Sequence, residues 1–137
     1  MKFSKLFALL LAVCLLCTAM VACNSTGDSE ETTEAATQVS ISVTLVVKNG
    51  SSEVSREAVS YKGDNPTLGE IIEIFCVGNE YAEPFDANGL LTTIGDLTKG
   101  DGKSWIAYYE SEGKNEAFDS IKDQPVADGQ VVVLALE

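Results

Sequence analysis

The chain has 137 residues, of which 21 are acidic, 9 are basic and none is histidine. A formal net charge of −12 makes nucleic acid and anionic lipid surfaces poor partners. Without histidine, Ser-His-Asp and Cys-His catalysis and most zinc chemistry are excluded, so the composition favours a protein that is not an enzyme and has no metal cofactor.

Residues 1–22 have the pattern of a secretory signal. Two lysines precede an apolar run that contains no acidic residue and ends at Ala22. Cys23 follows, as in the lipobox of bacterial lipoproteins, where the cysteine is lipidated. An uncleaved membrane anchor is the alternative, because the run is almost long enough to cross a bilayer. We expect a lipid-anchored protein on the extracytoplasmic face of the cell membrane.

Residues 23–38 comprise Cys23 and a small, polar, acidic stretch that predicts a flexible tether. Cleavage before Cys23 leaves 115 residues with 21 acids against 7 bases, a net charge of −14. That length suffices for one domain, residues 39–137. Cys76 is its only cysteine, so no internal disulfide forms there, and we expect Cys76 to be a buried hydrophobe.

The domain begins with two expected strands. Apolar and polar residues alternate over 39–48, which predicts a half-buried strand, and Asn49-Gly50 predicts a two-residue hairpin turn. The run 53–61 is a weaker strand whose apolar phase shifts after Val54. This shift indicates a β-bulge or an edge position.

Residues 66–77 have the clearest helical periodicity. Thr67 and Glu70 are placed to form a capping box after Pro66, and Gly78-Asn79 offers a residue with positive φ to end the helix. Five apolar residues share one face: Leu68, Ile71, Ile72, Phe75 and Cys76. Because so short a helix is marginal alone, we expect it to pack on the strands.

Three further strands are expected, at 89–95, 104–110 and 131–136, with one helical turn near Phe118 and Ile121. The last run is apolar on both faces, which fits a central strand. The order predicts an α+β fold, a β-grasp in which a mixed sheet of about five strands wraps one helix. The last strand then lies beside the first.

Aromatic residues mark both faces of the 104–110 strand. Trp105 and Tyr109 point one way, and Ile106 and Tyr108 point the other. Ordinary core and cross-strand packing is one interpretation. The other is a surface for a flat ligand or a partner protein, with these four residues as the candidate ligand-binding set.

The acidic residues in the predicted turns do not form a recognisable metal-binding motif. A twelve-residue calcium loop around 86–89 fails because Pro84 stands at its opening position. A looser cation site near Asp96 and Asp101 is the alternative to solvated turn acids.

Four weak motifs follow the order and spacing of the DUF4430 domain: 67–72, 89–95, 104–109, and 119–121 together with 126–131. Residues 39–137 thus resemble that family, which is similar to the C-terminal β-domain of transcobalamin and intrinsic factor. The resemblance implies a soluble-ligand-binding β-grasp fold. In the vertebrate relatives this domain closes over cobalamin with the region matching the Trp105 strand. Ala107 departs from the aromatic residue common at its position, and the chain lacks the carriers' helical clamping domain.

Together these features predict a bacterial surface lipoprotein with a non-catalytic, small-ligand-binding domain. Its expected task is the capture of cobalamin or another corrinoid for uptake by a membrane transporter. The alternative is a protein-interaction or scaffold module at the cell envelope, which uses the aromatic strand or a sheet edge as its contact.

Overall fold

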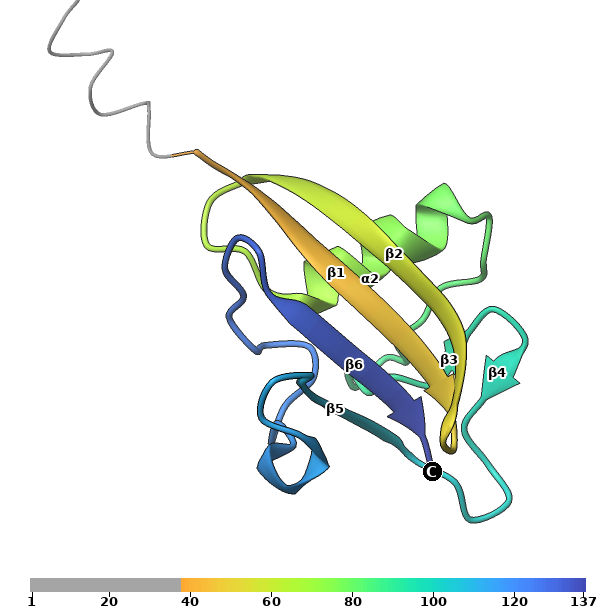
Figure 1. The fold of residues 1–137 in the computed structure, drawn as a ribbon. Coiled ribbons are helices and arrows are strands. Elements are labelled where there is room, and N and C mark those ends of the chain that lie inside the picture. The colour runs from red at the N-terminus through yellow and green to blue at the C-terminus, as the bar shows by residue number, and fades with distance from the viewer. Residues whose placement is uncertain (1–37) are drawn as a thin grey trace, which may run out of the picture. The chain divides into compact units, whose positions relative to one another are not determined.

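The computed structural model describes residues 38–137, which form one α+β unit. The signal, Cys23 and the tether up to residue 37 lie outside the described residues. The main sheet has the strand order β2 (Ser52–Gly63), β1 (Val39–Asn49), β6 (Val131–Leu136) and β5 (Trp105–Tyr109). The sheet is mixed: β1 pairs antiparallel with β2 and parallel with β6, and β5 pairs antiparallel with β6 (Figure 1). The last strand therefore lies beside the first, as predicted.

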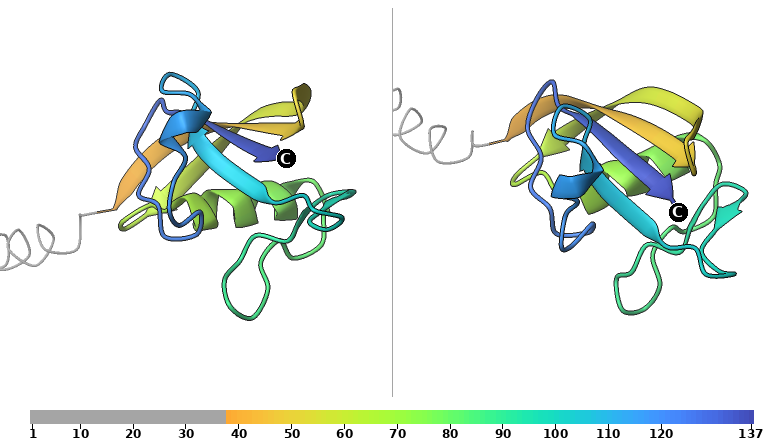
Figure 2. Two further views of the ribbon diagram at one scale, coloured as in Figure 1. Left: turned by 90° about the horizontal axis from the view of Figure 1, so that it is seen from below. Right: turned by 60° about the horizontal axis from the view of Figure 1, so that its bottom comes forward.

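Helix α2, Leu68–Gly78, crosses one face of this sheet (Figure 2). The predicted capping box is present: the Glu70 amide donates to the Thr67 hydroxyl, and the Glu70 carboxylate accepts from the Thr67 amide at 3.1 Å. All five apolar residues of the predicted face are buried. The helix ends where it was predicted, at Gly78 with Asn79 as its C-cap, but the residue with positive φ is Glu80 and not Gly78 or Asn79. The Tyr81 amide then donates to the Cys76 carbonyl, as in a Schellman motif.

The start of α2 is docked on the segment before β6. Its first amides, those of Leu68 and Gly69, donate to the carbonyls of Gln124 and Lys122 at 2.7 and 3.0 Å. These contacts satisfy donors that have no partner within the helix. Residue 69 must be glycine for this approach, because an added Cβ would lie 2.7 Å from the Lys122 carbonyl oxygen.

The hairpin between β1 and β2 differs slightly from its prediction. Its two loop residues are Gly50 and Ser51, one position later than expected, and Gly50 has a φ of 60°. A glycine with positive φ at the first loop position is the preference of type II′ turns. Val47 pairs with Ser55 and Lys48 with Glu53, which leaves Val54 as a bulge. Because β2 is also an edge strand, both interpretations of the phase shift are confirmed.

The prediction of a sheet of about five strands was wrong, because the main sheet has four. Within 89–95 only β3, Thr93–Ile94, is extended, and it pairs with β4, Leu97–Thr98, in a separate ribbon. Gly95, with a φ of 59°, turns the chain back after β3. The helical turn expected near Phe118 and Ile121 also differs: a 3₁₀ turn, η1, spans Lys114–Glu116.

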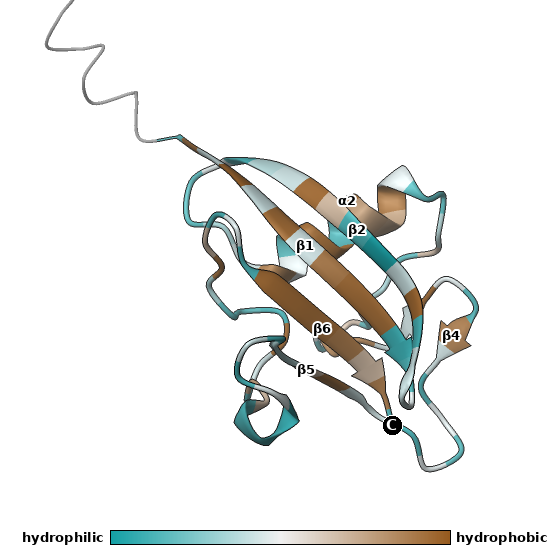
Figure 3. Cartoon of the chain, viewed as in Figure 1, coloured by the Kyte–Doolittle hydropathy of each residue, from teal (hydrophilic) through white to brown (hydrophobic). Residues whose placement is uncertain are grey.

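The main sheet is apolar on both faces. The main core lies between the sheet and α2, and a smaller cluster on the outer face comprises Val46, Tyr108, Val133 and Ala135. Figure 3 shows hydrophobic residues along β1 and β6, the two central strands. Among residues 38–137, no helix is long and apolar enough to cross a membrane.

Candidate functional site

The structure divides the four candidate ligand-binding residues between two faces of β5. Trp105 and Tyr109 lie on the side of the main core, whereas Tyr108 and Ile106 belong to the outer cluster. Tyr108 is only 9% exposed and pairs with Val133 across the sheet. The four residues therefore do not form one continuous surface, and only the inner pair lies near the loops that follow α2 and β5.

Both inner aromatic residues have structural partners. Trp105 is 8% exposed, and its indole N–H donates to the Thr92 carbonyl at 3.2 Å. The Tyr109 hydroxyl donates to the Pro125 carbonyl at 3.2 Å, and its ring packs edge-to-face on Phe118 with 4.7 Å between ring centroids. Most of the indole is thus fixed in the core before any ligand arrives. A fixed ring can still present its exposed edge to a ligand at low entropic cost.

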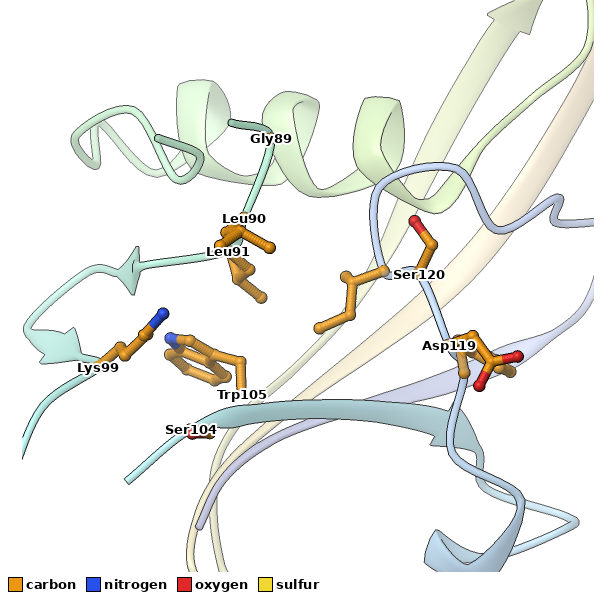
Figure 4. A pocket seen from close by; sticks show the side chains of 10 residues that line it. Gly89, Leu90, Leu91, Lys99, Ser104, Trp105, Asp119 and Ser120 are labelled. Atoms are coloured by element: carbon orange, nitrogen blue, oxygen red, sulfur yellow. The ribbon is translucent and has the colours of Figure 1, made fainter. Parts of the chain in front are cut away.

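That edge of Trp105 lines a pocket of about 230 Å³. Three segments build the pocket: residues 89–91, the turn that leads from Lys99 to Trp105, and residues 118–121. In Figure 4 the Lys99 side chain extends toward the indole, and Leu90 and Leu91 lie across from β5. The pocket therefore combines an aromatic edge, an aliphatic wall, the ammonium group of Lys99 and the carboxylate of Asp119.

Sequence reasoning missed the residues of this pocket other than Trp105. Leu90 is 53% exposed and lines this pocket. Its loop is shaped by Asp86, whose Oδ1 accepts from the amides of Asn88 and Leu90 at 2.9 and 3.0 Å. An apolar residue directly after an Asn-Gly turn was the available signal.

The described residues contain no group of three or more Cys, Asp or Glu side chains close enough to hold a metal. Asp86, the first acid of the partial calcium-loop pattern, is instead engaged with backbone amides of its own turn. On the other side of that loop, the Lys122 ammonium lies 5.4 Å from the centroid of the Phe85 ring, a cation–π contact. Asp86 thus has a structural role in its own turn.

No family model matches the chain, and no curated protein matches it either. Among solved structures, the chain is similar to a "putative metal binding protein" from Ruminococcus gnavus. The two chains are 24% identical, and the match covers 71% of this chain and 96% of the other with a TM-score of 0.48. A likeness this distant does not carry a function from one chain to the other.

Proposed function

We propose that the chain is a non-catalytic binding module of the β-grasp class, held at the membrane by a lipid on Cys23. The β-grasp assignment is supported by the sheet order, by the parallel pairing of the first and last strands, and by the single helix on one face. The non-catalytic assignment is supported by the composition, which contains no histidine. Its ligand is a small solute that enters the pocket beside Trp105.

The observation that carries this proposal is the shape and chemistry of the Trp105 pocket. Its 230 Å³ is less than the roughly 300–1,000 Å³ of sites that enclose drug-sized ligands. It therefore accepts one edge of a large flat ligand, while exposed Leu90 supports the rest from the rim. Lys99 provides an ammonium group for a phosphate or amide oxygen of the ligand.

A corrinoid fits this description, because it is flat, amphipathic and rich in amide oxygens. A pocket that holds only one edge also agrees with the resemblance to carriers in which a second domain completes the enclosure. Capture at the membrane surface for a transporter is the corresponding task. Binding by this chain alone is then weak, since most of the ligand stays in water.

Trp105 is the only tryptophan of the chain, so its fluorescence reports directly on this pocket. We expect cobalamin or cobinamide to quench it with saturation, after correction for absorbance, and calorimetry to give the same affinity. Leu90→Ser and Lys99→Ala should each weaken binding about fivefold or more. Val77→Ser is the matched control, since Val77 is exposed on α2 and does not line the pocket. No heat and no saturable quenching at millimolar ligand would refute the corrinoid proposal.

A protein-interaction module at the cell envelope is the second candidate. The observation that favours it is the edge of β2, a strand of 12 residues that, within residues 38–137, pairs on one side only. Pull-down from solubilised membranes separates the two candidates. A stoichiometric protein partner without a bound small molecule supports the second.

A further inference from the structure

The backbone of Trp105 faces the outer edge of β5. At the start of the strand, the Ser104 amide donates to the Glu137 carbonyl at 2.6 Å, and the Glu137 amide donates to the Ser104 carbonyl at 3.0 Å. At the end of the strand, the Glu110 amide donates to the Val131 carbonyl at 3.0 Å. Because paired and outward residues alternate along an antiparallel strand, the N–H and C=O groups of Trp105 point away from β6.

Other outward groups of β5 are occupied by the loop that follows the strand. The Tyr109 carbonyl accepts from the Gly113 amide at 3.0 Å, and the Ala107 carbonyl accepts from the Phe118 amide at 2.8 Å. Within residues 38–137, no hydrogen bond reaches the backbone N–H or C=O of Trp105, although this residue is only 8% exposed. Backbone groups that are so nearly buried normally have a partner, so these two groups are the ones with which a ligand can pair.

These two groups border the Trp105 pocket. Ser104 and Trp105 line it from β5, and residues 118–121 line it from the other side, beginning at the Phe118 amide that is bonded to Ala107. In Figure 4 the start of β5 lies at the base of the pocket. The pocket therefore lies along the part of the β5 edge that no other strand of the main sheet covers.

The pairing requirement of the two groups defines the ligand. The Trp105 N–H needs an acceptor, and the Trp105 C=O needs a donor. A carboxylate or an ester supplies acceptors only, an ammonium group supplies donors only, and an amide supplies both. The ladder with β6 fixes this part of the backbone, so the two groups cannot turn toward a different partner.

We propose that the outward N–H and C=O of Trp105 determine the specificity of the pocket, and that they select ligands with amide groups at the edge that enters it. An amide oxygen of the ligand accepts from the Trp105 N–H, and an amide N–H of the ligand donates to the Trp105 carbonyl. A ligand without a donor leaves that carbonyl unpaired, and sites of this kind discriminate strongly. The inference rests on the proposed function, since a ligand must enter this pocket, but that ligand need not be a corrinoid.

Two compounds with the same corrin ring test the donor requirement. Cobinamide carries amides around its ring, whereas the heptamethyl ester of cobyrinic acid carries uncharged esters that accept but do not donate. The test uses calorimetry on the full chain in a neutral detergent, with correction for the partition of each compound into detergent alone. We expect the affinity for cobinamide to be about tenfold higher than that for the ester, or more.

A second pair of compounds has no corrin ring. N-acetylglycinamide has an N–H and a C=O on either side of one carbon, as a strand residue does, and methyl acetoxyacetate has a similar shape without a donor. In NMR titrations we expect only N-acetylglycinamide to shift the Trp105 amide signal downfield and to slow its hydrogen exchange. The Ile106 amide, which faces β6, is the internal control and should not change.

Two variants separate the backbone of Trp105 from the side chains of the pocket. Asp119→Ala removes a carboxylate that is also able to accept from an amide, and Lys99→Ala removes the ammonium group. In both variants the preference for cobinamide over the ester should stay within about twofold of wild type, whatever the change in absolute affinity. Loss of the preference in Asp119→Ala would assign the selection to that carboxylate and overturn the proposal.

The outcomes distinguish this inference from the proposed function. Equal binding of cobinamide and the ester, with no shift at Trp105, overturns the amide preference and leaves the pocket as a ligand site. Absence of corrinoid binding, together with a Trp105 shift caused by N-acetylglycinamide, supports the inference and refutes the corrinoid proposal. No response of the Trp105 amide to either amide compound overturns the inference.

Discussion

Arg56 on β2 and Glu110 at the end of β5 approach to 2.6 Å across the outer face of the sheet, although β1 and β6 lie between their strands. Arg56 begins a cross-strand row that continues through Val46 and Val133 to Tyr108. Glu53 holds the other side of the guanidinium at 3.1 Å. The ion pair therefore joins the two edges of the sheet over its outer apolar cluster.

This ion pair predicts a pH-dependent contribution to stability. Hydrogen bonds from Arg56 hold the pKa of Glu110 and of Glu53 below the ordinary value of 4.5. Because the folded pKa values are lowered, the contribution is present above about pH 4.5 and is lost as the pH falls through the folded values. Glu110→Gln should lower the melting temperature slightly at pH 7, and this effect should shrink as the pH falls below 4.5. Glu112→Gln is the control, and an equal effect of both changes would contradict the prediction.

Two glycines of α2 should respond to alanine in opposite ways. Gly69→Ala places a Cβ 2.7 Å from the Lys122 carbonyl oxygen, so the docked segment must shift, at a cost of about 1–3 kcal/mol. An added Cβ at Gly78 meets nothing within 4 Å, and its φ is not positive. Gly78→Ala should therefore stabilise by about 0.5–1 kcal/mol. Urea denaturation measures the change in the free energy of unfolding for both variants. A stabilising Gly69→Ala would show that the start of α2 is not closely packed against the segment that contains Lys122.

The stability of the core between the sheet and α2 should depend on the buried side chains of α2. Ile72 is fully buried, and Ile72→Ala should lower the free energy of unfolding by about 2–5 kcal/mol through lost contacts and a cavity. Val77→Ala on the exposed side of the same helix should change it by less than about 0.5 kcal/mol. Chemical denaturation followed by circular dichroism checks the pair. Similar costs at both positions would mean that α2 does not face the sheet as described.

The Cys76 thiol should not react with alkylating reagents in the folded protein. Its thiol is buried in the core, and burial raises its pKa, with a smaller contribution from Glu73. Alkylation by iodoacetamide at pH 8 should therefore label wild type and Cys76→Ala to the same extent under native conditions. In urea the wild type should gain one additional label per chain. Rapid native labelling of the wild type alone would place the thiol at the surface.

Local rules predicted the regular parts of this fold. The capping box of Thr67 and Glu70, the buried face of α2 and the Val54 bulge each depend on residues close in sequence. The central place of β6 followed from its apolar composition on both faces. Such features need no knowledge of distant contacts, and the structure confirms them.

The irregular parts depended on contacts that periodicity does not encode. The chain around Thr92 and Thr93 is held by the Pro84 carbonyl, which receives both amides, and this leaves only two residues for β3. The end of α2 uses Glu80 in the left-handed region, where glycine or asparagine was expected. The Trp105 pocket combines three separate loops, so its other members could not be found from the β5 pattern alone.

The parallel pairing of β1 with β6 has a consequence for how the domain folds. β6 comes after every other strand in the chain, yet it lies between β1 and β5. Until residues 131–136 are in place, the hairpin and β5 have no common neighbour, and the edge of β1 over residues 44–49 has no partner strand among the described residues. Contacts of such long sequence separation slow folding. Losing those six residues would therefore divide the sheet in two.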